Sequence, residues 1–133
     1  MRIYVASYFN TRDRIIPYVN KLKELRHVIT SSWLSEVPRG DITKTETTLY
    51  TPNELKGFAV ADVIDLHNSD AVILDTVDMT PRGGREVEWG AFVFGAVRFG
   101  FVVGPKRNVF HELATGNFED WEQCIDFFMK LRV

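Results

Sequence analysis

The chain of 133 residues has a single cysteine, no long uninterrupted apolar run and no excess of basic residues. Cys124 alone cannot form an internal disulfide, which favours a reducing compartment, and we expect the cytoplasm. The most apolar stretch, residues 91–103, is interrupted by Gly95, Arg98 and Gly100 and falls short of a membrane span. The first ten residues lack the apolar core of a signal peptide. We therefore expect a soluble protein with no membrane partner.

Charge and histidine spacing exclude further classes of partner. Sixteen basic and eighteen acidic residues give a formal net charge of -2, which offers little attraction for polymeric nucleic acid. His27, His67 and His111 lack the spacing of metal ligands, so neither a metal nor another cofactor is expected. The hydrophobic content of 45% is sufficient for one substantial core, and we expect a single domain over residues 1–133.

Strand-like and helix-like patterns alternate along the chain. We expect strands near residues 3–6, 28–33, 70–76 and 101–103, and helices near residues 15–25, 51–66, 84–94 and 121–131. Residues 35–50 are expected to form a long loop. Thr51 and Glu54 have the spacing of a capping box at the start of the second helix.

Two helices have predicted inward faces that bear on function. In the second helix the inward residues are Leu55, Phe58, Ala59 and Leu66, and in the third they are Val87, Ala91 and Phe94. Asp62 falls on the same stripe as the apolar residues of the second helix. A carboxylate in that position requires a polar partner.

The alternation of strands and helices predicts an α/β fold of the flavodoxin/Rossmann type, with a parallel sheet and helices on both faces. Ligands of such sheets bind beyond the carboxyl ends of the strands, where the strand order reverses. The site is therefore expected where the turn after residue 6, the segment after residue 74 and the turn before Glu88 meet.

The segment TPRGGREVEWG, residues 80–90, carries the strongest chemical signal. Gly83 and Gly84 allow the backbone to approach a ligand, and the following helix start supplies free N–H groups. Glu88 lies one position away from the predicted apolar stripe, so its carboxylate could face a cleft. Alternatively, Glu86 and Glu88 only complement the helix dipole.

Asp70 opens the third predicted strand and Asp75 closes it. Two carboxylates at one cleft could divide the nucleophile and acid/base roles, as in glycoside cleavage. Alternatively, Asp70 is a turn or cap residue. Tyr4 in the first strand is either a core residue or a hydrogen-bond partner of a nucleophilic carboxylate.

Substrate-binding candidates follow the first two strands. Phe9 and Trp33 could sandwich a flat base, although aromatic residues at these positions also suit the core. Ser7 belongs to the same turn as Phe9. Arg12 and Arg82 lie near helix starts, where they could bind a phosphate.

Four segments together resemble the nucleoside 2-deoxyribosyltransferase-like family, which includes the deoxynucleoside 5'-monophosphate N-glycosidases. They are IYVAS, DVIDLHNSDAVIL, RGGREVEWG and VVGPKRNVFH. The resemblance implies that Glu88 attacks C1' of a deoxyribose and holds it as a glycosyl ester. It also implies that Asp70 protonates or orients the departing base, that Tyr4 hydrogen-bonds the nucleophile and that Gly84 lines the sugar site.

The resemblance further implies a homodimer or larger homo-oligomer, because the transferases take an asparagine from a neighbouring subunit. Asn108 is the counterpart of that asparagine in this chain. Arg82 stands where the transferases have an aspartate and the monophosphate hydrolases a serine, which suggests an anionic substrate group. The first loop, SYFNTRDR, lacks the glycine-rich phosphate loop of the hydrolases.

We therefore expect the substrate to be a small deoxynucleoside or its 5'-monophosphate, and hydrolysis and base transfer are both left open. One alternative is a non-catalytic module of the same fold that binds or senses a nucleotide. Another is a phosphate-handling domain of the flavodoxin type. That domain would need acidic metal ligands after the first strand, and the segment SYFN contains none.

Overall fold

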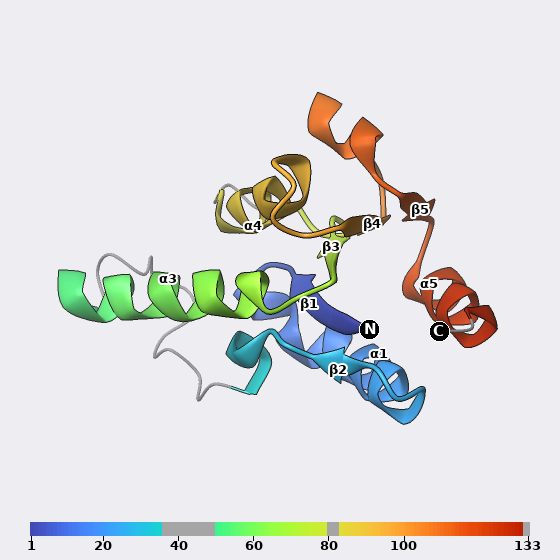
Figure 1. Ribbon diagram of the computed structural model, residues 1–133, viewed down its shortest axis with the longest axis horizontal. Helices are drawn as coiled ribbons and strands as arrows, with labels where there is room; N and C mark the ends of the chain where they lie inside the picture. The colour runs from blue at the N-terminus through green and yellow to red at the C-terminus, as the bar shows by residue number, and fades with distance from the viewer. Residues whose placement is uncertain (36–49, 80–82, 132–133) are drawn as a thin grey trace.

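The computed structural model describes residues 1–35, 50–79 and 83–131, and its strands form one parallel sheet (Figure 1). In the strand order β2-β1-β3-β4-β5, β2 lies on one side of β1 and the later strands lie on its other side, so the order of strands reverses between β1 and β3. This order confirms the predicted α/β fold of the flavodoxin/Rossmann type. The strands are β1 (Arg2–Ala6), β2 (Val28–Ile29), β3 (Ala71–Asp75), β4 (Phe99–Val103) and β5 (Gly116–Phe118).

Helices cover both faces of the sheet (Figure 1). On one face α1 (Arg12–Glu24) packs beside α5 (Trp121–Lys130), and on the other α3 (Pro52–His67) packs beside α4 (Gly84–Val93). Three 3-10 helices, η1 (Phe9–Thr11), η2 (Ser32–Ser35) and η3 (Val109–Leu113), complete the described elements. With helices on both faces, all five residues of β3 are buried.

Helices α1 and α5 bury the faces that their periodicity predicts. Ile15, Val19 and Leu22 of α1 are in the core, and the helix continues through Pro17. Helix α5 buries Trp121, Cys124, Ile125 and Phe128. Both helices have one strongly apolar side, which explains why their orientation is predictable.

The second strand is shorter than the predicted range of 28–33. Beyond β2, side chains bond to the backbone of Val5 in β1 in place of a further strand residue. Ser31 Oγ accepts from the Val5 N–H at 3.1 Å, and Trp33 Nε1 donates to the Val5 carbonyl at 2.8 Å. Trp33 is buried by this arrangement. Residues 36–49, which make up most of the predicted loop, lie outside the described residues.

The capping box at the start of α3 is confirmed. The Thr51 hydroxyl accepts from the Glu54 N–H, and the Glu54 carboxylate accepts from the Thr51 N–H. The predicted inward face of α3 is right in part, since Leu55 and Phe58 are half-buried and Ala59 is exposed, whereas that of α4 is largely wrong. Of the four predicted residues of α3 only Leu66 is buried. In α4, Val87 is 77% exposed and Phe94, at its C-cap, is 89% exposed, and the helix buries Arg85 and Trp89 instead.

Candidate active site

The phenol of Tyr4 lies at the centre of the candidate site. Tyr4 is fully buried in β1, where it pairs with Val72 of β3 at the reversal of strand order. Burial raises the pKa of Tyr4 well above its usual value, and the negative charges of Glu88 and Asp62 raise it further. Its hydroxyl interacts with the Glu88 carboxylate, but the geometry falls short of a regular hydrogen bond with any described residue.

Glu88 is positioned by the packing of α4 on the sheet. Gly83 is the N-cap of this helix, and Arg85 and Trp89 are its buried residues. Glu88 is half-buried, and one of its carboxylate oxygens is shielded from solvent. The structure therefore brings Glu88 to Tyr4, as the sequence interpretation requires of a nucleophile and its tyrosine partner.

The charge of a second carboxylate, on α3, acts on the same phenol. Asp62 is half-buried with one oxygen shielded, and its charge acts on Tyr4 together with that of Asp65, one turn further along the helix. The sequence predicts that Asp62 needs a polar partner, but it does not predict that Asp62 belongs to the site. The signal that could have found it is an aspartate on the inward side of a helix that crosses over the first strand.

The structure does not bring Asp70 to this site. Asp70 precedes β3, at the amino edge of the sheet, and its side chain hydrogen-bonds the backbone of β1. Its Oδ2 accepts from the Arg2 N–H at 2.8 Å, and its own N–H donates to the Arg2 carbonyl. This is the turn or cap role that the sequence left open as the alternative.

The glycine turn before α4 is open on its described side. Gly83 and Gly84 are exposed, and an added Cβ at either position would meet no atom within 4 Å. This space is compatible with a ligand close to the backbone. Arg82, the predicted phosphate-binding residue, lies outside the described residues.

Three predicted binding residues gather at the carboxyl end of β1. Ser7 hydrogen-bonds Thr11 at 2.8 Å between their hydroxyl oxygens, and the Arg12 guanidinium lies 5.2 Å from the centre of the Phe9 ring. Phe9 packs against Trp33 with ring centres 6.0 Å apart. Since Trp33 is buried, it supports Phe9 from behind and does not offer an open face for a base.

Asn108 faces the opposite side of α4 from Glu88. It caps η3, and its side-chain amide donates to Glu86 at 3.2 Å. Glu86 also accepts from Nε2 of the buried His111 at 2.9 Å. Successive residues of a helix are rotated by about 100°, so Glu86 and Glu88 point to nearly opposite sides. Within one chain Asn108 therefore does not join the site around Tyr4.

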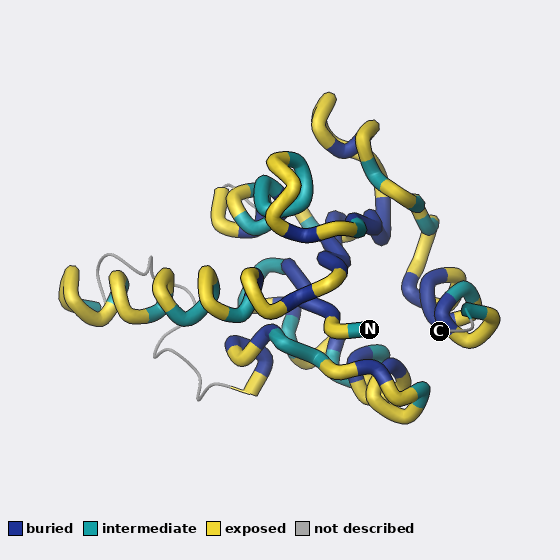
Figure 2. Tube along the Cα trace, viewed as in Figure 1, coloured by how far each residue is buried: buried dark blue, intermediate teal, exposed yellow. Residues whose placement is uncertain are grey.

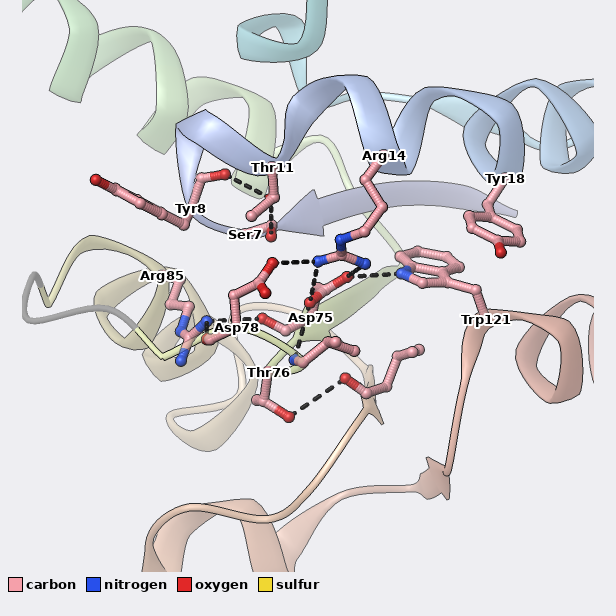
Figure 3. A network of polar contacts seen from close by, with 12 residues as sticks. Ser7, Tyr8, Thr11, Arg14, Tyr18, Asp75, Thr76, Asp78, Arg85 and Trp121 are labelled. Carbon is pink, nitrogen blue, oxygen red and sulfur yellow. Dashed lines mark hydrogen bonds and ion pairs between the residues drawn. The ribbon is translucent and has the colours of Figure 1, made fainter. Parts of the chain in front are cut away.

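An ion pair between the half-exposed Arg14 and the buried Asp75 holds the segment that follows β3 (Figure 3). The carboxylate of Asp75 is inaccessible to solvent and accepts from both Nη atoms of Arg14 at 3.2 Å and from Trp121 Nε1 at 2.7 Å. Asp78 binds the same guanidinium at 2.7 Å, and Arg85 donates to the carbonyls of Asp75 and Asp78. These bonds hold the chain on its way to α4.

The described residues hold no cluster of histidine, cysteine or acidic side chains suited to a metal ion. Nor does any helix within residues 1–35, 50–79 and 83–131 combine the length and apolar character needed to cross a membrane.

Comparison with solved structures identifies the fold. A structure of the 2-deoxyribosyltransferase from the psychrotolerant bacterium Bacillus psychrosaccharolyticus matches with a TM-score of 0.73 and 19% sequence identity, covering 95% of this chain and 91% of that one. This chain has the 2-deoxyribosyltransferase fold. A crystal structure of a conserved protein from Enterococcus faecalis V583 also matches this chain, with a TM-score of 0.59, 12% identity and 98% coverage of both chains.

Sequence comparison adds no closer assignment within the 2-deoxyribosyltransferase fold. No protein-family model matches the chain, and no curated protein matches it.

Proposed function

We propose that this chain cleaves or exchanges the N-glycosidic bond of a small deoxynucleoside or its 5'-monophosphate, with Glu88 as the nucleophile. The observation that supports the proposal is that the charges of Glu88 and Asp62 both act on the buried phenol of Tyr4, which lies where the strand order reverses. The likeness to a solved 2-deoxyribosyltransferase supports the same class of chemistry.

In the first step, an oxygen of Glu88 attacks C1' of the deoxyribose as the bond from C1' to the base nitrogen breaks. The electrons of that bond move to the base, and a protonated Asp62 donates its proton to the departing nitrogen. The products are a glycosyl ester on Glu88 and a neutral base. Because burial and negative charge raise the pKa of Tyr4, its hydroxyl stays protonated and can orient the nucleophile.

In the second step, water or another base attacks C1', and the ester bond to Glu88 breaks with its electrons returning to the carboxylate. Asp62, now ionised, accepts the proton that the incoming nucleophile loses. Water yields free deoxyribose, and a second base yields a new nucleoside. Hydrolysis and transfer therefore use the same residues and differ only in what enters the site.

The test is to incubate the protein with deoxynucleosides and their 5'-monophosphates, with and without an acceptor base, and to follow free and exchanged bases by chromatography. We expect Glu88→Gln to lower the rate by roughly three orders of magnitude or more, as loss of a nucleophile does in other enzymes. Glu86→Gln is the matched control, because Glu86 lies on the same helix but contacts His111 and Asn108. It should retain the rate of the parent.

Mass spectrometry of the intact protein gives a second readout, since a trapped ester adds one deoxyribosyl group to the parent and none to Glu88→Gln. Equal activity of Glu88→Gln and the parent would exclude the mechanism. Saturable nucleotide binding without base release, unchanged by Glu88→Gln, would favour the alternative of a non-catalytic binding module.

A further inference from the structure

Helix α3 is weakly anchored by apolar packing, although it carries Asp62. Leu66 is its only buried residue, and Val60, Val63 and Ile64 are 48%, 50% and 53% exposed. Most of the α3 tube has the colour of exposed residues (Figure 2). Burial of an apolar face is what normally fixes a helix on its sheet. The position of Asp62 must therefore depend to an unusual degree on polar contacts of α3.

Those contacts form a polar latch, which we define as Thr30, Ser32, Asp65 and Ser69. Asp65 Oδ2 accepts from both the N–H and the hydroxyl of Ser32, at 3.0 and 2.6 Å. Ser69 Oγ donates to the Asp65 carbonyl at 2.7 Å and lies 2.6 Å from Thr30 Oγ1, which must then be the donor to Ser69. The two bonds to the Asp65 carboxylate are charge-assisted and so are the strongest of the set.

The same short segment is also bonded to β1, directly beside Tyr4. Val5 donates its N–H to Ser31 Oγ at 3.1 Å and accepts from Trp33 Nε1 at 2.8 Å at its carbonyl. Ser31 and Trp33 flank Ser32 in the chain. Ser32 thus connects the helix that carries Asp62 to the strand that carries Tyr4, through contacts on both of its sides.

We propose that Asp65 and Ser32 are positioning residues that fix α3, and with it Asp62, relative to Tyr4 on β1. Asp62 precedes Asp65 by three residues, a rise of about 4.5 Å on the same side of the helix, so a shift of α3 at Asp65 moves Asp62 with it. This inference rests on the proposed function, in which Asp62 must reach the departing base. The Asp65 carboxylate is hydrogen-bonded to Ser32 and is not proposed to contact the reacting atoms.

Ser32→Ala tests the inference because it removes one bond of the latch and keeps every charge. For a natural deoxynucleoside we expect kcat to fall by about tenfold, the effect of losing one charge-assisted hydrogen bond, with KM within about twofold of the parent. Ser32→Thr keeps the hydroxyl and should restore kcat. Ser35→Ala is the matched control in the same 3-10 helix, since among the described residues the Ser35 hydroxyl donates to the Ser32 carbonyl and makes no bond to α3.

The decisive readout is the dependence on the leaving group. An aryl deoxyriboside whose phenolate departs without a proton does not need Asp62, so Ser32→Ala should cleave it at the rate of the parent. A fall for both substrates would indicate general damage and would overturn the positioning role. An unchanged kcat for the natural substrate would also overturn it. A parent protein that releases no base from either substrate would instead refute the proposed function.

Hydrogen exchange of the backbone amides of α3 provides a readout that needs no activity. If the latch anchors the helix, residues 63–69 should exchange faster in Ser32→Ala than in the parent and in Ser35→Ala. Equal exchange in all three proteins would show that Ser32 does not hold α3, and the inference would fail.

Discussion

Asp62 and Asp70 are the two carboxylates between which the acid role must be decided. Asp62 acts on Tyr4 together with Glu88, whereas Asp70 bonds the backbone of Arg2 at the other edge of the sheet. We expect Asp62→Asn to lower kcat for a natural deoxynucleoside by about 10²–10⁴-fold, the usual contribution of a general acid. Asp70→Asn should leave kcat close to that of the parent, and rates of base release measure both.

Thermal unfolding of the two variants serves as a control, because a loss of activity that follows a loss of folded protein carries no information about chemistry. The opposite ranking, with Asp70→Asn inactive and Asp62→Asn active, would restore the assignment that the family resemblance implies. It would also mean that the described arrangement of α3 is not the one that reacts.

The sequence predicted Glu88 and Tyr4 as site residues, and it did not predict Asp62. A carboxylate behind a glycine turn and a tyrosine in the first strand are recognisable as patterns. Asp62 was visible only as a charge on an inward stripe, because Tyr4, whose pKa it raises, is 58 positions away in the chain. Asp70 could have been set aside, since a residue that opens a parallel strand lies at the edge away from the ligand.

The packing of α4 on β4 depends on the absence of a side chain at Gly100. A Cβ added there would lie 2.5 Å from the Phe92 ring and 2.8 Å from Trp89. Gly100→Ala should therefore push α4 away from the sheet and reduce the free energy of unfolding by about 1–3 kcal/mol, the typical cost of overpacking a core. Because α4 carries Glu88, activity should fall as well. Urea denaturation and the rate of base release measure the two effects.

Gly57→Ala is the control for this prediction. Gly57 lies within α3, and an added Cβ would meet nothing within 4 Å. Alanine there should stabilise the protein by up to about 1 kcal/mol through its higher helix propensity. If Gly100→Ala were as stable as Gly57→Ala, the close packing of α4 on β4 would not be what fixes the helix.

The elements that the sequence predicts well are those with one clearly apolar side. Helices α1 and α5 belong to this group, and the orientation of both is as their periodicity indicates. Helices α3 and α4 have apolar residues around most of their circumference, so periodicity cannot select the buried side. Strand β5 was missed because Gly116, Asn117 and Phe118 carry little strand signal without their neighbour β4.

The molecule exposes apolar side chains on the face formed by α3 and α4. Val60, Val63 and Ile64 of α3 are about half exposed, and Val87 of α4 and the adjoining Phe94 are exposed further (Figure 2). Exposed apolar side chains on two neighbouring helices are typical of an interface between protein chains. We expect a second copy of this chain to cover it, which would give the homo-oligomer that the family resemblance implies.

Val63→Lys should weaken that association, because it places a charge where the copies would meet, and sedimentation velocity at several concentrations would measure the shift toward monomer. Met129→Lys is the matched control, since Met129 is 62% exposed on α5, on the opposite face of the sheet.

The site around Tyr4 is bounded by α3 and α4, so a chain packed on this face would also restrict its access to water. Val63→Lys should therefore raise KM, and Met129→Lys should leave KM unchanged. A parent protein that is monomeric at all concentrations, or equal association of both variants, would contradict this arrangement.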